Sequence, residues 1–393
     1  MKRVSVGIIG AGFSAALQVE GLRKVFGFKV AIAAVAATSQ TSAGDFASRH
    51  GIPTSYDNYI DLLADSTIDV VCVCVPNSLH APVILAAARA GKHIICEKPL
   101  TGAFGATSDA ARKGRAASEL QLVRGSLDEL ERVVRSAGVL FMYAENWIYA
   151  PAMTKTKRLL GLSGGRILDI RAEESHSGSH ASRTRKRITS GGGALLSLGS
   201  HPIGAAIHLK DFEARANSST RVTVQAVTAN IATFDSQGLD PNRGWLVSDW
   251  EDVERWSNVV LDFSDGSRAV VTASFAMLGG VRNLLEVYTT NAVFRANVTP
   301  NDGLMIFSPD AMAFGDEYLH EKVESRAGWV AASPDEDWAR GYPQEMQDFV
   351  ECVASGRQPV SDLTLARQVV EVIYASYVSA EQGRRIDLTT SPN

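Results

Sequence analysis

The sequence predicts an α/β protein of two domains, the first built on a parallel sheet and the second on a large, open and mostly antiparallel sheet. A short apolar run, residues 4–9, leads into Gly10-Ala11-Gly12 and then into a helical stretch from Phe13 to Val25. From Arg166 onward, apolar and polar residues alternate with a period of two, which is typical of half-buried strands. The chain has 393 residues, which is too long for one simple core.

The composition is that of an ordinary soluble globular protein, with 45% hydrophobic and 21% charged residues. A net charge of -4 gives no general attraction to nucleic acid or to anionic membranes, and no stretch approaches the ~20 apolar residues of a membrane span. Four cysteines in so long a chain do not form a disulfide framework. The start Met1-Lys2-Arg3 resembles a signal peptide, but glycines interrupt the apolar run that follows. We therefore expect a cytoplasmic protein with neither nucleic-acid nor membrane partners.

The stretch around Gly10 predicts a dinucleotide site. A strand, a Gly-x-Gly turn and a helix open a dinucleotide-binding βαβ unit. Gly10 permits the tight turn, and Gly12 lets the backbone approach a pyrophosphate at the N-terminus of the helix. Ala15 stands in place of the third glycine, which the fingerprint tolerates. We expect Phe13 and Ser14 to border the cofactor as well.

The second strand, residues 29–37, ends without the residue that normally selects the cofactor. An acidic residue at this place binds the ribose of NAD, and an arginine accommodates the 2′-phosphate of NADP. Here Thr38 and Ser39 follow the strand, and their hydroxyls suit either group. We expect NAD, with NADP left open. Helices are expected over residues 45–50 and 59–64.

Polar residues follow two further strands of the predicted parallel sheet. Residues 68–75 form a third, nearly all apolar strand, and residues 93–96 form a fourth. The carboxyl ends of strands in such sheets face the ligand crevice. We therefore expect the residues after these two strands to contact the cofactor: Pro76, Asn77, His80, Glu97 and Lys98.

A polar and aromatic cluster, residues 145–149, follows the next strand, residues 139–144, where the chain leaves the first domain. Glu145, Asn146 and Tyr149 are expected to contact the substrate. Residues 126–137 predict a helix that begins with a capping box, Ser126 with Glu129.

Together, Gly10-Ala11-Gly12, Pro76-Asn77 with His80, and Glu97-Lys98-Pro99-Leu100 resemble the Gfo/Idh/MocA oxidoreductases, the relatives of glucose–fructose oxidoreductase and inositol dehydrogenase. The resemblance implies a Rossmann domain over residues 1–147 and a substrate-binding α/β domain over residues 148–393, with a bound nicotinamide cofactor. Residues 341–393 resemble the family's closing helices, which pack back on the chain. Residues 101–124 are longer than the family usually has there, and we expect an inserted loop or short helix.

The stretch from Gly191 to Pro202 is similar to the family motif Gly-Gly-Gly…Asp-x-Gly-x-His. His201 matches the catalytic histidine of that motif, whereas Ser197 stands where the family has aspartate. A helix over residues 197–201 would place both side chains on one face. Pro202 is best tolerated in a first helical turn, which favours a helix that starts near Ser200.

A charged stretch, residues 173–187, allows two interpretations. It is either a solvated loop or a cap whose arginines bind an anionic substituent of a sugar, since guanidinium bonds two oxygens at once. The spacing of His176 and His180 suits zinc, but the Ser-Gly-Ser between them disfavours the necessary helix, so no metal is expected. The substrate candidates of this stretch are Glu174, His180, Arg183 and Arg185. The neighbouring tryptophans either stack on a sugar or seal a subunit interface: Trp245, Trp250 and Trp256.

The predicted reaction is hydride transfer between a nicotinamide and a secondary hydroxyl of a sugar, C3 of a pyranose that carries an anionic group. Such a step needs a base and a stabilised alkoxide. Lys98 is the first candidate base and His201 the second, with Glu145 and His176 as further catalytic candidates and Ser197 as a substrate contact.

Two alternatives remain open. An NAD-dependent glycosidase would oxidise C3 of an acidic, sulfo- or uronic, glycoside, eliminate the aglycone, add water and reduce the ketone again. A cofactor-binding sensor would lack catalysis. In each case the expected partners are a small molecule and further copies of the chain, as a dimer or tetramer.

Overall fold

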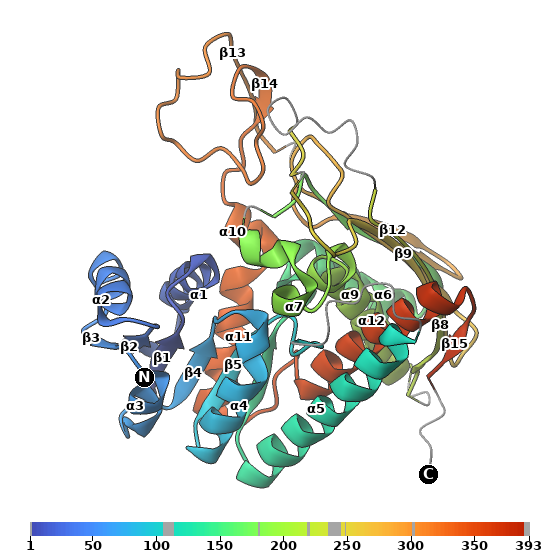
Figure 1. Cartoon of the computed structure of the whole chain (residues 1–393). Helices are drawn as coiled ribbons and strands as arrows, with labels where there is room; N and C mark the ends of the chain where they lie inside the picture. The colour runs from blue at the N-terminus through green and yellow to red at the C-terminus, as the bar shows by residue number, and fades with distance from the viewer. Residues whose placement is uncertain are drawn as a thin grey trace. The chain divides into compact units, whose positions relative to one another are not determined.

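The computed structural model describes residues 2–104, 114–179, 181–217, 221–234, 245–247, 249–300 and 303–388. The chain divides into two compact units (Figure 1). The first unit comprises Met1–Ala103, Gln121–Tyr149 and Gly341–Val370. The second unit comprises Phe104–Leu120, Ala150–Arg340 and Glu371–Asn393.

The first unit is built on a six-stranded parallel sheet with the order β3-β2-β1-β4-β5-β6. Its central strands are buried and apolar because helices cover both faces of such a sheet. The order reverses between β1 and β4, which is where open parallel sheets bind ligands. The strands are β1 (Arg3–Ile9), β2 (Lys29–Ala36), β3 (Thr54–Tyr56), β4 (Val70–Val73), β5 (His93–Glu97) and β6 (Phe141–Ala144).

The expected parallel sheet is therefore present, with one addition. The edge strand β3 has only three residues, which is too short for the sequence to reveal a period. The helices of this unit are α1 (Phe13–Arg23), α2 (Gln40–Arg49), α3 (Tyr59–Ala64), η1 (Asn77–Leu79), α4 (His80–Arg89), η2 (Asn146–Tyr149) and α11 (Tyr342–Ser355).

Helix α11, from the carboxyl-terminal part of the chain, packs on α1. Gly21 of α1 makes this close approach possible. A Cβ atom at Gly21 would lie 2.9 Å from Cγ of Met346 and 3.2 Å from the carbonyl oxygen of Tyr342. The first unit is thus completed by a segment that is distant in the sequence.

Two helices, α5 (Arg115–Ala137) and α12 (Leu363–Gln382), are divided between the units. Helix α5 begins earlier than the expected start at Ser126, which lies inside it, with its hydroxyl 3.3 Å from that of Thr101. The helix extends because apolar residues continue at helical spacing before Ser126. The buried residues before Ser126 are Ala116, Leu120 and Val123, and the spacing continues after it with Leu127 and Leu130. Residues 115–124 of the expected insertion are therefore the start of a long helix.

The second unit contains a seven-stranded sheet with the order β12-β11-β7-β10-β9-β8-β15. Strands β7 and β10 are parallel, and the other neighbours in this described sheet are antiparallel, as expected. A tight turn at Asp265-Gly266 joins β9 and β10, where the sequence predicts a hairpin. The strands are β7 (Ile167–Ser175), β8 (Val224–Ala232), β9 (Trp256–Phe263), β10 (Arg268–Ser274), β11 (Arg282–Thr289), β12 (Val293–Asn297) and β15 (Ile386–Asp387).

A separate two-stranded sheet pairs β13 (Met305–Ser308) with β14 (Gly328–Ala331). Helix α9 begins at Ser200, so Pro202 lies in its first turn as expected, and it packs against β7 and α6. Among the residues that the structure describes, no helix has both the length and the apolar character needed to span a bilayer. The helices of this unit are α6 (Pro151–Ser163), η3 (Ser182–Arg185), α7 (Arg187–Ser190), α8 (Ala194–Ser197), α9 (Ser200–Ala216) and α10 (Glu336–Arg340).

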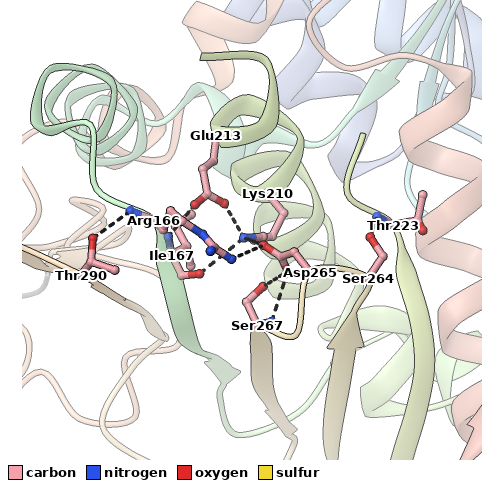
Figure 2. A network of polar contacts seen from close by, with 9 residues as sticks. All are labelled: Arg166, Ile167, Lys210, Glu213, Thr223, Ser264, Asp265, Ser267 and Thr290. Carbon is pink, nitrogen blue, oxygen red and sulfur yellow. Dashed lines mark hydrogen bonds and ion pairs between the residues drawn. The ribbon is translucent and has the colours of Figure 1, made fainter. Parts of the chain in front are cut away.

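A buried lysine fixes the far end of α9 (Figure 2). Lys210 is 0% exposed, and its ammonium group pairs with Glu213 and, at 2.8 Å, with Asp265 in the β9–β10 turn. Glu213 in turn accepts a hydrogen bond of 2.6 Å from the backbone N–H of Ile167 at the start of β7. The network therefore ties α9 to two parts of the sheet and positions the helix that carries His201.

Candidate functional site

Four strands of the parallel sheet end at the same edge. Ile9, Val73, Cys96 and Tyr143 lie in one row across β1, β4, β5 and β6. The residues that follow them consequently leave the sheet together. This register gathers the polar residues that the sequence places at separate strand ends, among them Gly10, Asn77, Glu97, Lys98 and Glu145.

The turn after β1 requires glycine. Gly10 has φ +114, and a Cβ atom there would lie 2.3 Å from the carbonyl oxygen of Cys74 on the neighbouring strand connection. Gly12 is the N-cap of α1, where a Cβ atom would meet nothing within 4 Å. The helix has no side-chain cap and no acidic residue in its first turn.

The N–H groups at the start of α1 therefore suit a pyrophosphate. Phe13 is 72% exposed beside this turn, and Ser14 is half-buried. The arrangement fits a dinucleotide cofactor, as predicted from the Gly-x-Gly turn.

At the end of β2, Ser39 has a structural partner. Its hydroxyl accepts a hydrogen bond of 3.2 Å from the backbone N–H of Ser42 and so caps α2. Helix α2 begins at Gln40, earlier than expected, because Ser39 supplies this cap. Thr38 is exposed next to it.

His80 joins the loops that follow two strands of the parallel sheet, and its role in cofactor binding stays a prediction. Its ring is 1% exposed, with Nδ1 2.7 Å from the carbonyl oxygen of Pro99 and Nε2 3.0 Å from that of Val75. Burial lowers the pKa of His80, against the two carbonyls that favour its charged form. Both ring nitrogens are thus engaged between the loops that follow β4 and β5. Pro76 and Asn77 lie in the first of these loops, partly accessible to solvent.

Lys98 lies beside two carboxyl groups. It follows Glu97 at the end of β5, and its peptide bond to Pro99 is cis. Loss of solvation raises the pKa of Glu97, while a 2.8 Å hydrogen bond from Gln18 and the charge of Lys98 oppose that rise. Glu145 is 0% exposed, and burial raises its pKa to about 8 against the nearby ammonium group of Lys98.

Tyr149 and Asn146 lie in η2 and are buried. The hydroxyl of Tyr149 donates to Oδ2 of Asp348 at 2.7 Å and accepts from the backbone N–H of Ser361 at 3.0 Å. This hydroxyl therefore joins η2 to α11 within the first unit. Contact of Tyr149 with the substrate stays a prediction.

In the second unit, the glycine triplet 191–193 is packed against a buried acid. A Cβ atom at Gly193 would lie 1.9 Å from the carbonyl oxygen of Glu254, and one at Gly192 would lie 2.2 Å from the hydroxyl of Tyr377. Oε1 of Glu254 accepts hydrogen bonds from the N–H groups of Gly193 and Leu195, at 2.9 and 3.0 Å, and so caps α8. The glycines thus seat the short helix that precedes His201.

Ser197 and His201 are not on one continuous helix. Ser197 ends α8, and His201 is the second residue of α9. The backbone N–H of His201 donates to Leu198 at 3.2 Å. The imidazole is 5% exposed, and Ser197 is half-buried.

The basic run is largely paired with acids, and whether its arginines bind an anionic substituent stays open. Arg185 pairs with Asp249, and Lys186 pairs with Glu251 at 2.9 Å. Arg183 is exposed in η3.

Arg187 was not expected to be buried. Its guanidinium donates two hydrogen bonds to Glu119 of α5, at 3.0 and 2.5 Å, and lies 4.5 Å from the ring centre of Tyr377. The sequence does not reveal this ion pair, because Glu119 falls in the segment that was predicted to be an insertion. The helical part of that segment therefore holds α7 next to the glycine triplet.

His176 and Trp250 pack on one phenylalanine. Nδ1 of His176 accepts from the N–H of Gly178 at 2.9 Å, which places the ring proton on Nε2 when the imidazole is neutral. The ring centre lies 5.3 Å from that of Phe275, on which Trp250 stacks at 4.7 Å. Glu174 is buried on β7.

His180 lies outside the described residues. Among the residues that are described, no group of three or more His, Cys, Asp or Glu side chains is arranged to hold a metal ion.

Comparison with known proteins identifies both parts of the chain. Residues 4–123 match the sequence model of an oxidoreductase family with an NAD-binding Rossmann fold. Residues 163–295 match that of the GFO/IDH/MocA C-terminal domain.

Relatives and solved structures cover most of the chain. It is 27% identical to D-xylose 1-dehydrogenase (NADP(+)) 2 of Haloferax volcanii, over 91% of each chain. It is 29% identical to levoglucosan dehydrogenase of Pseudarthrobacter phenanthrenivorans, over 53% of this chain and 52% of that one. The structure of GenD2 from gentamicin A biosynthesis with NAD superposes with a TM-score of 0.80 at 24% identity, over 99% of this chain and 97% of that one. The structure of a levoglucosan dehydrogenase with NADH and levoglucosan superposes with a TM-score of 0.73 at 23% identity, over 99% of this chain and 100% of that one.

Proposed function

This chain belongs to the Gfo/Idh/MocA family of NAD(P)-dependent oxidoreductases, and on that premise we propose that it oxidises a secondary hydroxyl of a sugar. The observation that carries the proposal is the position of Lys98. It follows β5 at the sheet edge that also holds the glycine turn, next to two carboxyl groups. The names of the relatives, xylose and levoglucosan dehydrogenases, support a sugar as substrate.

The cofactor supplies the hydride acceptor, and the turn around Gly10 and Gly12 with the start of α1 would hold its pyrophosphate. Thr38, at the end of β2, is the candidate for the adenosine ribose. Pro76 and Asn77 would border the cofactor from the loop after β4.

Lys98 is proposed to take the proton of the substrate hydroxyl and to stabilise the oxygen while the hydride leaves. Two carboxyl groups respond to its charge, because Lys98 opposes the rise in the pKa of both Glu97 and Glu145. His201, which matches the family's histidine, is proposed as the second acid–base group, with Ser197 and Asn146 as substrate contacts. C3 of a pyranose is the proposed site of oxidation.

A second candidate function is NAD-dependent glycoside cleavage through transient oxidation of C3. The observation in its favour is Ser197, which stands where the family motif has aspartate. His176 and Glu174 would then supply further acid–base groups. The pairing of Arg185 with Asp249 weakens the choice of an anionic sugar, because a substrate anion would compete with that carboxylate.

We also propose that the protein forms a homo-oligomer, a dimer or tetramer, in the cytoplasm. Phe307 and Trp329, paired across β13 and β14, are 58% and 70% exposed, as is common for surfaces that associate. Free cysteines suit a reducing compartment. Sedimentation of the purified chain would measure the assembly.

The test is turnover of a panel of neutral and acidic sugars and their nitrophenyl glycosides with NAD or NADP. We expect NADH or NADPH to accumulate with a free sugar. We expect Lys98→Ala to reduce kcat at least 1,000-fold, of order 4 kcal/mol, while NAD binding changes little. A fully active Lys98→Ala enzyme would contradict the assignment. Release of nitrophenol that needs NAD without net reduction would establish the second candidate.

A further inference from the structure

Glu345 of α11 is a buried carboxyl group that the roles proposed above do not use. It is 0% exposed, and neither of its oxygens has a hydrogen-bond partner within the described part of the chain. A buried polar group without a partner costs folding stability. Groups of this kind gather at functional sites, where the protein tolerates that cost.

The surroundings of Glu345 are the strand ends that carry Lys98. Loss of solvation, followed by the neighbouring charges of Glu97 and Glu145, raises the pKa of Glu345 well above its usual value. The hydroxyl of Tyr143 and Oε1 of Gln18 are also buried without a partner in the described structure. The titratable groups that face this cluster come from β4, β5, β6, η2 and α11: Cys72, Cys74, Cys96, Glu97, Lys98, Tyr143, Glu145, Tyr149 and Asp348.

The charges in this cluster do not balance if every carboxyl group is ionised. Lys98 contributes one positive charge, whereas Glu97, Glu145 and Glu345 would contribute three negative ones. Like charges that share a dry site cannot all ionise, so protons stay on the groups with the least compensation. The Gln18 amide and Lys98 favour the ionised form of Glu97. Lys98 and the backbone N–H of Trp147 favour the ionised form of Glu145. Glu345 has no such compensating group, so it is the last of the three to lose its proton.

We propose that Glu345 is a positioning residue that keeps its proton beside Glu97 and Glu145, and that Glu145, once ionised, accepts the proton that Lys98 takes from the substrate. This inference rests on the proposed function. In the oxidation, the C–H bond breaks and its electron pair leaves with the hydride for the nicotinamide. The substrate O–H bond breaks as an N–H bond forms on the neutral amine of Lys98. Above about pH 8, where Glu145 is ionised, that N–H bond of Lys98 breaks and an O–H bond forms on the carboxylate of Glu145.

The direct test is infrared spectroscopy of the protein with saturating NAD, as a function of pH. A protonated buried carboxyl group has a carbonyl stretch that a carboxylate lacks. At pH 7 we expect such a band in the wild type and its loss in Glu345→Gln. A second band should titrate near pH 8 and disappear in Glu145→Gln. Glu351→Gln on the same helix, 40% exposed, is the matched control and should retain both bands.

The variant Glu345→Met distinguishes an effect of Glu345 on the titration of Glu145 from an effect on packing. Because it removes an unpartnered buried carboxyl group, we expect Tm to rise by about 3 °C. Loss of this polar neighbour should also raise the titration midpoint of Glu145 by about one pH unit. The acid limb of kcat against pH should move by the same amount, whereas Glu345→Gln should leave it in place.

Two results would overturn the inference: no carboxyl band at pH 7 that Glu345→Gln removes, or a Glu145 midpoint that Glu345→Met leaves unchanged. These spectra need no substrate. Absence of turnover with every sugar would therefore count against the proposed function, while the bands decide the role of Glu345.

Discussion

Solvation decides what each carboxyl group does at the edge of the parallel sheet. Glu129 on α5 is 49% exposed, whereas Glu145 is buried, and the loss of solvation raises its pKa to about 8. Lys98 compensates only part of that loss. A buried group whose pKa is strongly shifted in this way is a candidate for a role in catalysis, because such groups gather at functional sites.

The raised pKa of Glu145 makes stability depend on pH. The folded protein holds this proton up to about pH 8, whereas the unfolded chain releases it near pH 4.5. Between these values the folded state binds more protons, so the free energy of unfolding falls as pH rises, by up to about 1.4 kcal/mol per pH unit. Glu145→Gln lacks this term and should become more stable relative to wild type at each step from pH 5 to 8.

Urea unfolding at pH 5, 6.5 and 8 measures that difference. Glu129→Gln, with 49% exposure, should show no such trend. A constant difference between Glu145→Gln and the wild type over this range would mean that Glu145 is ionised throughout.

At the scale of elements, single helices are held by charges that come from distant parts of the chain. Helix α8 is capped by Glu254 rather than by a residue of its own first turn. Helix α7 is held through Arg187 by Glu119 of α5. Helix α9 is held at its far end by Lys210. These contacts fix the segment that carries Ser197 and His201, although the charged residues that make them are not adjacent to Ser197 or His201 in the sequence.

Lys210→Ala should destabilise the second unit strongly. The substitution leaves the carboxylates of Glu213 and Asp265 without their cation, and breaking a buried pair in this way costs about 3–5 kcal/mol. Arg215→Ala on the same helix removes an exposed ion pair with Asp211 and should cost less than about 1 kcal/mol. Equilibrium unfolding of both variants gives the comparison, and equal losses would show that the Lys210 network contributes no more than a surface pair.

At the scale of the whole molecule, each unit has its own sheet and its own buried residues. The nucleotide turn belongs to the first unit alone. A ligand that binds only folded protein adds about 2.7 kcal/mol of stability at 100 times its Kd.

We therefore expect NAD to raise the thermal transition of the first unit and to leave the transition of the second less affected. Gly10→Ala should abolish this shift, because its Cβ would overlap the carbonyl of Cys74 and its φ of +114 disfavours alanine. Calorimetry with and without NAD measures both effects. An equal shift in wild type and Gly10→Ala would place the nucleotide elsewhere.

The sequence predicts those features that depend on neighbours along the chain. Gly10 and Lys98 were predicted as site residues because each directly follows an apolar strand, and strand ends of a parallel sheet share one edge. The α/β class, the mostly antiparallel second sheet and the nicotinamide cofactor were predicted correctly for similar reasons.

The sequence does not reveal partners that only the fold brings together. Glu345 and Gln18 are far from Glu97 in sequence, and nothing in their own segments marks them. His80 and Tyr149 were predicted to contact ligands because they are polar residues at strand ends, and the sequence did not reveal the backbone carbonyls and Asp348 that contact their polar atoms. Arg187 lay in a stretch that was read either as a solvated loop or as a cap, because its acidic partner lies before the second domain.

Because helix α11 completes the first unit, the folding of that unit depends on the order in which the chain is synthesised. The ribosome releases the six strands of the parallel sheet first, but the helix that covers Gly21 and brings Glu345 near Glu97 and Glu145 emerges only after strands β7 to β14. During translation the first unit therefore waits, with part of α1 uncovered, until these strands have been made. Domains normally fold one after another from the amino terminus. Here the nascent chain acquires its buried carboxyl cluster only after most of the second sheet has been synthesised.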